Sequence, residues 1–384
     1  MAMVGVESRA GGVQKLDRAL NSVDDVLMAL LRACAPVRPV SLTPSRAIGL
    51  IAAQDYVALQ PIPSCNEALM DGRAVASVDL IGASAMSPAF AMREPPLVRV
   101  GDPIPDDCDS VIDDALVVGA GGAFEIHGAV APGDGVRRAG EDVGMGSTLL
   151  RAGARITLWD AHVLEAAGCS ALDVRHPRVR VFASSQRTEG DATSQLIAKL
   201  AREEGMDVEL GSAGDSIPDA LQENWDAALV VGGSGVSVHD HSVDALRRCG
   251  QVIAHGFALD PGRTGAAGMI GGKPVICVAG RFESAIALYV ALVRPLLRHL
   301  SGAGPLPHVA SAPLARKIAS SVGVAQVCLL EAVDGKWAPL AVGDVTLASL
   351  LRAHAYIVIA DGSEGMAEGA VVRPLVLPGR SACA

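Results

Sequence analysis

Between residues 178 and 302, short apolar runs alternate with amphipathic stretches, a pattern that predicts strands followed by helices. The apolar runs that predict strands are 179–183, 206–210, 227–231, 252–257 and 275–278. The stretches with helical spacing are 193–204, 218–223, 242–248 and 283–300. Because strands joined through helices pair in parallel, the pattern predicts an α/β layer with a mostly parallel sheet and helices on both faces.

Different patterns lie on either side of this layer. Residues 22–35 predict an amphipathic helix, with Ser22 as its N-terminal cap. Proline and glycine recur every few residues from 61 to 146, which is typical of a small all-β lobe. A short helix is expected at 158–167, and a β-rich part is expected after residue 305. The strands of that C-terminal part are expected near 327–332, 357–360 and 371–376.

The composition limits the classes of function. The chain has 384 residues, half of them apolar, which is enough for two or three domains of about 150 residues each. Its 32 basic residues are outnumbered by 42 acidic ones, for a net charge of −10. No nucleic-acid partner is expected, because such proteins carry a surplus of Lys and Arg. Aromatic residues make up only 3% of the chain, which argues against a base-stacking or sugar-stacking function.

Cysteine usage and the distribution of charge favour a cytoplasmic protein. The eight cysteines lie far apart and include no C-x-x-C pair, so neither a zinc site nor a redox dithiol is expected. Charged residues are spread through the first thirty positions, which is not the pattern of an export signal. The longest apolar helix candidate, 285–297, is interrupted by Arg294 and Pro295 and is shorter than the roughly 20 residues that cross a bilayer. No membrane partner is therefore expected.

Glycine-bearing turns follow two of the predicted strands. The turn at 232–235, Gly-Gly-Ser-Gly, ends the run 227–231, and the turn at 279–281, Ala-Gly-Arg, ends the run 275–278. Ligands of open α/β sheets bind beyond the carboxyl ends of the strands, and free backbone N–H groups in such turns bind phosphate and other anions. A third loop carries Arg263, although a surface turn is the commoner reason for its Pro-Gly pair.

Well-known nucleotide and hydrolase motifs are absent from the sequence. There is no G-x-x-x-x-G-K-[ST] and no strand-following G-x-G-x-x-G, which weakens an ATPase or a dinucleotide enzyme as an interpretation. Residues 235–239 resemble a nucleophile elbow, but His239 replaces the final glycine, so a serine hydrolase is not expected. In an extended segment His239 and His241 would point to opposite faces and would not share a metal ion. Asp240 between them is suited to hold Mg²⁺ beside a phosphate.

Several short motifs follow one another in a distinctive order. They are Met-Asp-Gly-Arg-Ala-Val at 70–75, Gly-Asp-Pro-Ile-Pro at 101–105, Gly-Glu-Asp-Val at 140–143, the turn at 232–235 with Val-Ser-Val and Asp240, Pro-Gly at 261–262, and Gly280 before the long helix. In this order the motifs resemble those of the molybdopterin molybdenumtransferase family, which includes the E domain of gephyrin. The resemblance runs from about residue 23 to residue 377.

The resemblance implies four domains and an elongated homodimer with the site in a cleft between subunits. The expected domains are an elongated segment-swapped domain (15–60 and 143–176), an inserted β lobe (61–142), a central α/β molybdopterin-binding domain (177–304) and a C-terminal β domain (305–384).

The family's reaction also implies roles for individual residues. In molybdenum cofactor biosynthesis it takes adenylylated molybdopterin and molybdate, cleaves the adenylyl phosphate with Mg²⁺, and leaves the metal on the dithiolene sulfurs. The catalytic residues implied are Asp71, Asp142 and Asp240, with Mg²⁺ held by Asp240 and Asp71. The substrate-binding residues implied are Gly232, Gly233, Ser234, Ser237, Asp215, Arg263, Gly280 and Arg281. An upstream molybdopterin adenylyltransferase and a client molybdoenzyme are the expected partners.

Some positions depart from the family pattern. A Thr-Gly-Asp-Glu-Leu run is replaced by Ser-Gln-Arg-Thr at 185–188, which removes two carboxylates that Glu189 or Asp191 would have to replace. A Lys-Pro-Gly-Lys-Pro loop reads Asp-Pro-Gly-Arg-Thr at 260–264. These changes leave a second interpretation open. In it, the protein binds molybdopterin or the finished cofactor without inserting metal, as a carrier or assembly factor for a molybdoenzyme.

Overall fold

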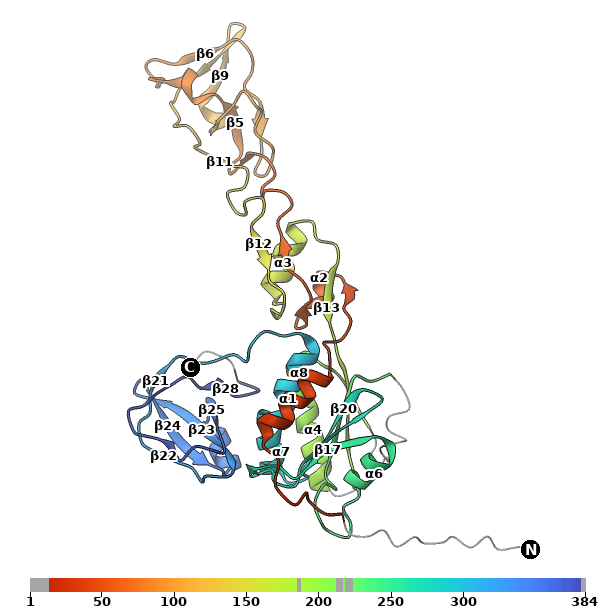
Figure 1. Ribbon diagram of the computed structural model, residues 1–384. Helices are drawn as coiled ribbons and strands as arrows, with labels where there is room; N and C mark the ends of the chain where they lie inside the picture. Colours follow the sequence, from red (N-terminus) through yellow and green to blue (C-terminus); the bar gives the residue numbers. More distant parts are fainter. Residues whose placement is uncertain (1–13, 185–187, 212–216, 218–223, 381–384) are drawn as a thin grey trace, which may run out of the picture. The chain divides into compact units, whose positions relative to one another are not determined.

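The structure is a computed structural model that describes residues 14–184, 188–211, 217 and 224–380. The chain divides into two compact units (Figure 1). Unit 1 comprises Met1–Gln54, Ala152–Thr157 and Ala171–Ala384, and unit 2 comprises Asp55–Arg151 and Leu158–Ser170. The finer division into four domains stays a prediction.

A six-stranded sheet forms the centre of unit 1 (Figure 1). Its strands, in spatial order, are β15 (Asp207–Leu210), β14 (Arg178–Ala183), β16 (Ala227–Val231), β20 (Lys273–Val278), β19 (Ala266–Ile270) and β17 (Gln251–His255). The first four run parallel, and β19 runs antiparallel to both of its neighbours. The mostly parallel α/β sheet predicted from the sequence is therefore confirmed. Strand β19 was not predicted, because its Ala-Ala-Gly-Met-Ile sequence has only one β-branched residue.

Helices cover both faces of this sheet because side chains alternate along its buried strands. Val181 and Leu229 point to the same cluster as α1, α4 and the long C-terminal helix, whereas Phe182 and Val230 pack with α6 on the other face. The helices are α1 (Val23–Ala33), α4 (Thr188–Glu203), α6 (Ser242–Cys249), α7 (Phe282–Leu288), the π-helical turn η3 (Tyr289–Val293) and α8 (Arg294–Ser301). The helix predicted at 218–223 lies outside the described residues.

Helix α1 begins where it was predicted, but not for the predicted reason. Ser22 occupies the N-cap position, yet its side chain makes no capping hydrogen bond, so that expectation was wrong. The start of the helix is instead fixed by the chain before it, where Asn21 pairs with Phe257 in a parallel bridge. The carbonyl of Asn21 also accepts the N–H of Ala258 at 2.8 Å. A small antiparallel sheet follows: β1 (Val40–Leu42), β13 (Leu172–Arg175) and β2 (Ile51–Ala52), with α2 (Pro44–Ala47).

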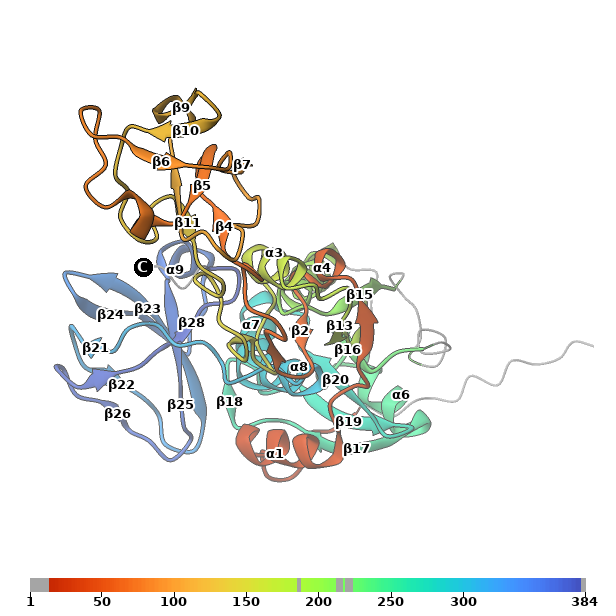
Figure 2. The same ribbon diagram turned by 90° about the horizontal axis from the view of Figure 1, so that it is seen from above.

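The C-terminal part of unit 1 is a second sheet, shown in blue in Figure 2. Its order is β18 (Leu259–Asp260), β23 (Ala325–Val333), β25 (Ala355–Ile359) and β28 (Leu375–Val376), and β24 (Lys336–Val342) also pairs with β23. Strand β18 comes from the chain between β17 and β19, so the α/β layer lends one strand to this sheet. The remaining elements are β21 (Ala312–Pro313), β22 (Ile318–Ala319), α9 (Leu347–Arg352), β26 (Gly365–Met366) and β27 (Val371–Val372). The predicted β-rich C-terminal part is confirmed.

Unit 2 is built from short strands and turns, as its proline and glycine content predicted. Two three-stranded sheets form its centre: β7 (Leu97–Val98), β5 (Gly72–Val75) and β8 (Ser110–Ile112), and β6 (Ala89–Ala91), β10 (Ala123–Ile126) and β9 (Val117–Ala120). The other elements are β3 (Tyr56–Val57), β4 (Glu67–Ala68), η1 (Ser77–Leu80), η2 (Asp114–Leu116), β11 (Val136–Arg137), β12 (Thr148–Leu150) and α3 (Leu158–Ala166). Throughout the described residues, no helix combines the length and apolar character that a membrane span requires.

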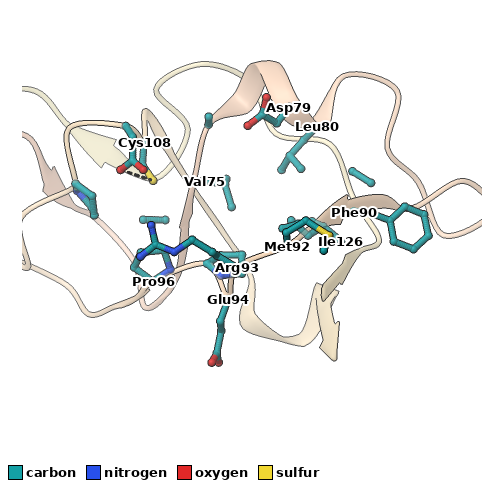
Figure 3. Close-up of a pocket in the computed structure, with 17 residues that line it drawn as sticks. Val75, Asp79, Leu80, Phe90, Met92, Arg93, Glu94, Pro96, Cys108 and Ile126 are labelled. Carbon is teal, nitrogen blue, oxygen red and sulfur yellow. Dashed lines mark hydrogen bonds between the residues drawn. The ribbon is translucent and has the colours of Figure 1, made fainter. Parts of the chain in front are cut away.

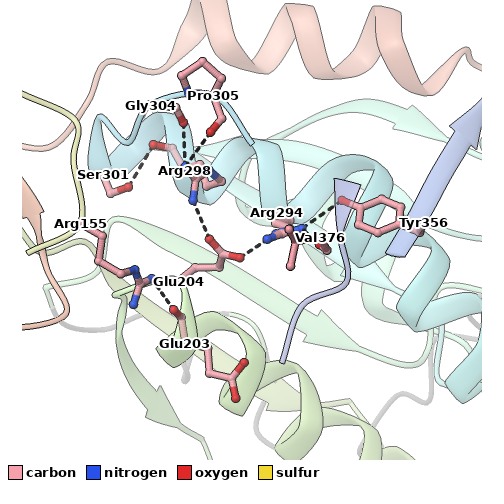
Figure 4. Close-up of polar contacts among 10 residues, drawn as sticks. All are labelled: Arg155, Glu203, Glu204, Arg294, Arg298, Ser301, Gly304, Pro305, Tyr356 and Val376. Atoms are coloured by element: carbon pink, nitrogen blue, oxygen red, sulfur yellow. Dashed lines mark hydrogen bonds and ion pairs between the residues drawn. The ribbon is translucent and has the colours of Figure 1, made fainter. Parts of the chain in front are cut away.

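A buried ion network ties α8 to the end of α4 and to the C-terminal sheet (Figure 4). Glu204 accepts hydrogen bonds from Arg294 Nε at 2.6 Å and from Arg298 Nη1 at 3.0 Å. Arg294 Nη1 also donates to the hydroxyl of Tyr356 at 3.2 Å and to the carbonyl of Val376 at 2.7 Å. Arg294 is only 3% exposed and Glu204 6%, so these charges depend on one another.

Candidate functional site

The carboxyl ends of the parallel strands meet at one edge of the unit 1 sheet. Val231, the last residue of β16, pairs with Val278, the last residue of β20. The first residue of β19, Ala266, pairs with Cys277, so the loop before β19 opens at this same edge. The turns at 232–235 and 279–281 and the loop that carries Arg263 therefore lie at a common edge of the sheet.

The two glycine-bearing turns are in direct contact. A Cβ atom on Gly280 would lie 3.3 Å from the Cα of Gly232, which is tighter than an ordinary contact. A Cβ on Gly233 would lie 2.5 Å from the hydroxyl oxygens of both Ser184 and Ser242. Gly233 also has a φ of +66°, in the left-handed region that favours glycine. The close approach of these backbones explains why glycine occupies the turn.

Residues 232–241, here called the glycine loop, turn their carbonyl groups into the protein. The carbonyl of Gly232 accepts the hydroxyl of Ser242 at 2.8 Å, and that of Gly233 accepts the backbone N–H of Ser242 at 3.0 Å. The carbonyl of Ser234 lies 2.9 Å from His255 Nε2. In the part of the chain that the structure describes, the N–H groups of residues 233–236 have no hydrogen-bond partner. The loop therefore offers a row of donors, which is the chemistry of an anion site.

Asp240 closes the far end of the glycine loop. Its carboxylate Oδ2 accepts the N–H of Ser237 at 2.8 Å, and its own N–H donates to the carbonyl of Ser237 at 3.0 Å. Among the described residues, Oδ1 of the same carboxylate accepts no hydrogen bond. Asp240 is half-buried, whereas Ser237, His239 and His241 are exposed. One carboxylate oxygen thus remains available beside the N–H row.

The predicted arginines and serines take up different positions around the loop. Ser234 is 1% exposed, and its hydroxyl has no partner among the described residues, so the residue offers its backbone to the site. Arg263 is exposed at the edge of the sheet. Arg281 is 80% exposed and lies 3.4 Å from Glu283. The pKa of Glu283 is lowered, first by its own backbone N–H and then by Arg281.

Two of the predicted acidic residues, Asp71 and Asp142, belong to unit 2, and others lie outside the described residues. Asp215 is outside the described residues, and so are the side chains of Glu189 and Asp191. Asp71 belongs to unit 2, where its exposed carboxylate accepts the N–H of Val100 at 2.9 Å. Asp142, also in unit 2, is exposed and lies 3.3 Å from Arg137. Within the described residues, no group of three or more His, Cys, Asp or Glu side chains is arranged to hold a metal ion.

Unit 2 has a hollow of its own, a groove of about 860 Å³ (Figure 3). Its wall includes apolar side chains from η1, β5, β6 and β10. Among the lining residues, Phe90 of β6 is 68% exposed and Met92, directly after β6, is 81% exposed. Cys108 lines the groove, and burial, with help from Asp107, raises the pKa of its thiol to about 11. At neutral pH the thiol is therefore protonated and a weak nucleophile.

The groove of unit 2 and the glycine loop of unit 1 differ in the charge around them. Seventeen acidic and six basic residues lie in unit 2, so the whole acidic surplus of the chain is there. Three acidic residues and one arginine line its groove. A multiply charged anion is repelled by such surroundings, whereas the glycine loop faces it with N–H groups. The glycine loop of unit 1 is therefore the better candidate for an anionic ligand.

Two residues of this site were not predicted from the sequence. Gln14 and His255 contact the carbonyl groups of the glycine loop, although they lie far from it along the chain. Neither belongs to a motif. Only the pairing of β17 with β19 brings His255 to the carboxyl edge, and β19 itself was not predicted.

Comparisons with known proteins agree with this picture. The profile of the MoeA N-terminal region (domain I and II) matches residues 16–168, and that of a probable molybdopterin binding domain matches residues 181–299. The chain belongs to the MoeA-like family. The second match contains the whole glycine loop and the turn at 279–281. The match to the MoeA N-terminal region covers nearly all of unit 2.

Relatives and solved structures extend the match over most of the chain. A putative molybdopterin biosynthesis protein of Methanocaldococcus jannaschii is 26% identical, over 85% of this chain and 89% of that protein. Molybdopterin molybdenumtransferase 2 of Mycobacterium tuberculosis is 27% identical, over 74% of this chain and 80% of its own length. Crystal structures of a molybdopterin biosynthesis MoeA protein from Pyrococcus horikoshii superimpose with TM-scores of 0.72 and 0.68 at 24% and 22% identity. They cover 94% and 93% of this chain and 100% of each structure, so the chain has the MoeA fold.

Proposed function

We propose that this protein inserts molybdenum into adenylylated molybdopterin and releases AMP, as a step of molybdenum cofactor biosynthesis. The observation that carries the proposal is the row of N–H groups at residues 233–236, which have no hydrogen-bond partner among the residues that the structure describes. It lies within the stretch that matches a probable molybdopterin binding domain. Relatives named molybdopterin molybdenumtransferase support the class of reaction.

The glycine loop suits the phosphate of the pterin. Phosphate oxygens accept hydrogen bonds from backbone N–H groups, and the positive end of α6 directly after the loop favours negative charge. The carbonyl groups of residues 232–235 point into the protein, so they do not repel the phosphate. We assign phosphate binding to the N–H groups of residues 233–236 and to the hydroxyl of Ser237. Gly232, whose N–H donates to the carbonyl of Val278 at 2.7 Å, and the adjoining turn at Gly280 shape the loop.

Asp240 fits the Mg²⁺ that the family reaction implies. Magnesium sites commonly use one or two carboxylates together with substrate phosphates and water. Asp240 supplies one carboxylate oxygen that is not used within the glycine loop. When bound there, Mg²⁺ would neutralise charge on the phosphate oxygens during cleavage. Asp240 itself holds the turn at Ser237 closed and keeps a negative charge next to the phosphate row.

The chemistry asked of the chain is mostly positioning. Water attacks the phosphoanhydride of the adenylylated pterin, the bond to AMP breaks, and the pterin keeps its terminal phosphate. The N–H row holds that phosphate and stabilises the charge that develops on it. Molybdate is an oxyanion, so Arg263 and Arg281, both exposed at this edge, would attract it.

One assay tests the proposal directly. Purified protein is incubated with adenylylated molybdopterin, molybdate and Mg²⁺, and AMP release is followed together with metal bound to the pterin. We expect both products, and we expect AMP release to stop when Mg²⁺ is chelated. Binding without AMP release would reject the transferase. It would favour the carrier, an alternative that the altered sequences at 185–188 and 260–264 support.

Reversing the charge of the two exposed arginines should weaken pterin binding. We expect Arg263→Glu and Arg281→Glu each to lower the affinity for molybdopterin by about tenfold, because repulsion replaces attraction at a partly solvated site. Calorimetric titration measures the change. Arg248→Glu, at the other end of α6, makes the same change of charge away from the edge and should bind normally. Unchanged affinity in both edge variants would show that these arginines only face solvent.

The remaining parts of the proposal are a homodimer, a cytoplasmic location, and catalytic roles for Asp71 and Asp142. They rest on the resemblance to the family and on the exposure of both carboxylates in unit 2. Light scattering of the purified protein measures the mass in solution, and a monomer over the working range of concentration would reject the dimer. Asp71→Asn and Asp142→Asn in the AMP assay test the two roles separately.

A further inference from the structure

The chain before α1 runs beside the glycine loop. Residues 14–21, here called the N-terminal strap, pair with the end of β17. The N–H of Asp17 donates to the carbonyl of His255 at 2.8 Å, and the N–H of His255 donates to the carboxylate of Asp17 at 2.9 Å. The N–H of Asn21 donates to the carbonyl of Gly256 at 3.0 Å. These bonds fix the strap along the carboxyl edge of the sheet.

At its start the strap reaches into the loop through one side chain. Gln14 is 3% exposed, and its Nε2 donates to the carbonyl of Gly233 at 2.9 Å and also to that of Gly235. The two neighbours are both carbonyl oxygens, so only the NH₂ end of the amide fits there. The Oε1 atom of Gln14 is buried and has no partner within the described residues. The amide is therefore oriented by the loop alone.

His255 holds the carbonyl of Ser234, which lies between those of Gly233 and Gly235. It is completely buried, and its Nε2 lies 2.9 Å from the carbonyl of Ser234. A carbonyl oxygen only accepts hydrogen bonds, so Nε2 carries the proton and donates it. The other ring nitrogen, Nδ1, is buried without a partner in the described part of the chain. Within the described residues, the hydrogen bond to Ser234 is thus the one polar contact of the ring.

These contacts determine which way the loop presents its N–H groups. In a planar trans peptide the N–H points opposite to the carbonyl. Three successive carbonyls, at residues 233, 234 and 235, are held from the protein side by Gln14 and His255. The N–H groups of residues 234, 235 and 236 belong to the same peptides, so they face the other way, where no described residue accepts their hydrogen bonds. The strap side and the donor side are two faces of one backbone.

We propose that Gln14 and His255 are positioning residues that set the preference of the glycine loop for a phosphate group. This inference rests on the proposed function, because the ligand is taken to be a phosphorylated pterin. Glycine-rich peptides rotate easily, and a rotated peptide would present a carbonyl oxygen to the phosphate and repel it. By holding the carbonyls inward, the two side chains keep the loop a donor surface before any ligand arrives.

The test compares ligands that differ only in the phosphate. Molybdopterin and its dephosphorylated form are titrated against the wild-type protein, Gln14→Ala and His255→Leu. Each variant should bind molybdopterin about tenfold more weakly, as expected when a hydrogen bond that holds a buried group is lost. Its affinity for the dephosphorylated pterin should stay within about twofold of the wild-type value. An equal loss for both ligands would mean that the two side chains serve only general structure, and it would overturn the inference.

Conservative variants separate the hydrogen bond from packing. Gln14→Glu keeps the shape of the side chain but puts oxygen where a donor is required, so it should lose phosphate affinity as Gln14→Ala does. His255→Gln keeps a donor where Nε2 stands and should recover most of the affinity lost in His255→Leu. Gln326→Ala is the matched control, because Gln326 is also buried and hydrogen bonded but lies in β23. No rescue by His255→Gln would contradict the proposed role of the donor.

A measurement without ligand keeps this inference separate from the proposed function. Hydrogen–deuterium exchange of the hydrogen-bonded amides at the two ends of the glycine loop, those of Gly232, Asp240 and Ser242, should rise in Gln14→Ala and His255→Leu, and exchange in α8 should not. If the wild-type protein binds neither pterin, the proposed function fails and the exchange data still decide whether the strap orders the loop. Unchanged exchange of the loop in both variants would overturn the inference even if the wild-type protein binds both pterins.

Discussion

Asp240→Ala is expected to lower the rate of AMP release from adenylylated molybdopterin by about a hundredfold while the protein stays folded. In the proposed function the carboxylate has two tasks at the glycine loop. One oxygen holds the N–H of Ser237 at 2.8 Å, and the other, which accepts no hydrogen bond from the described residues, would hold Mg²⁺ beside the phosphate. Alanine removes both. The measurement is the initial rate of AMP release at saturating pterin and Mg²⁺.

One further variant separates the loss of charge from the loss of the hydrogen bond, and a second serves as a control. Asp240→Asn keeps an oxygen that accepts the N–H of Ser237 but has no charge, so it should preserve the loop and still lose most of the activity. Asp244→Ala removes a carboxylate from the first turn of α6, where it is paired with Arg247 at 2.6 Å, and it should react normally. Full activity of Asp240→Ala would remove Asp240 from the mechanism.

Glu204→Ala is expected to destabilise unit 1 by about 3 kcal/mol or more. Glu204 is the carboxylate shared by Arg294 and Arg298, and Arg294 is almost completely buried. The pKa of Arg294 is raised. Burial alone would lower it, but Tyr356 and Glu204 more than offset that effect. Without Glu204, a buried guanidinium keeps its charge and loses its counter-ion.

Tryptophan fluorescence measures this loss of stability in unit 1. Trp225 and Trp337, each 4% exposed, belong to unit 1, whereas Trp159 of unit 2 is 76% exposed already. Urea unfolding monitored at the emission maximum therefore reports mainly on unit 1, and the midpoint should fall clearly in Glu204→Ala. Glu204→Gln, which keeps the shape and one acceptor oxygen, should lose less.

A partly exposed ion pair gives the control for that experiment. Glu331 pairs with Arg352 on the surface of the C-terminal sheet, within the same unit. The hydrogen bond from Arg352 is the first cause of a lowered pKa for Glu331, yet solvent screens the pair. Glu331→Ala should leave the urea midpoint unchanged. Equal shifts in Glu331→Ala and Glu204→Ala would show that burial of the network does not matter.

The regular part of the fold was predictable because its signals are local. A run such as Ala227–Val231 is uniformly apolar, and a strand buried on both faces requires that. The long helix after Gly280 was equally clear from its spacing, although that spacing did not indicate the π-helical turn at Tyr289–Val293. Strand β19 was missed because its pairing with β17 and β20, and not its own residues, makes it a strand.

The candidate site was only half predictable. The glycines at 232 and 233 predicted a turn with free N–H groups, and the parallel sheet implied that Gly280 would lie close to that turn. Gln14 and His255 had no such signal, because their partners are carbonyl oxygens, which every residue possesses. Contacts between a side chain and a distant backbone leave no pattern in the sequence, so only the three-dimensional structure identifies them.

Strand β18 connects the α/β layer to the C-terminal sheet, because it lies between β17 and β19 in the chain and pairs with β23. Leu259 pairs with Ala325 of β23, and only a few residues later the same stretch of chain carries Arg263 at the edge of the α/β sheet. A rigid shift of the C-terminal sheet would therefore move Arg263 as well. For the same reason, removal of the C-terminal sheet would leave β18 without its partner strand β23.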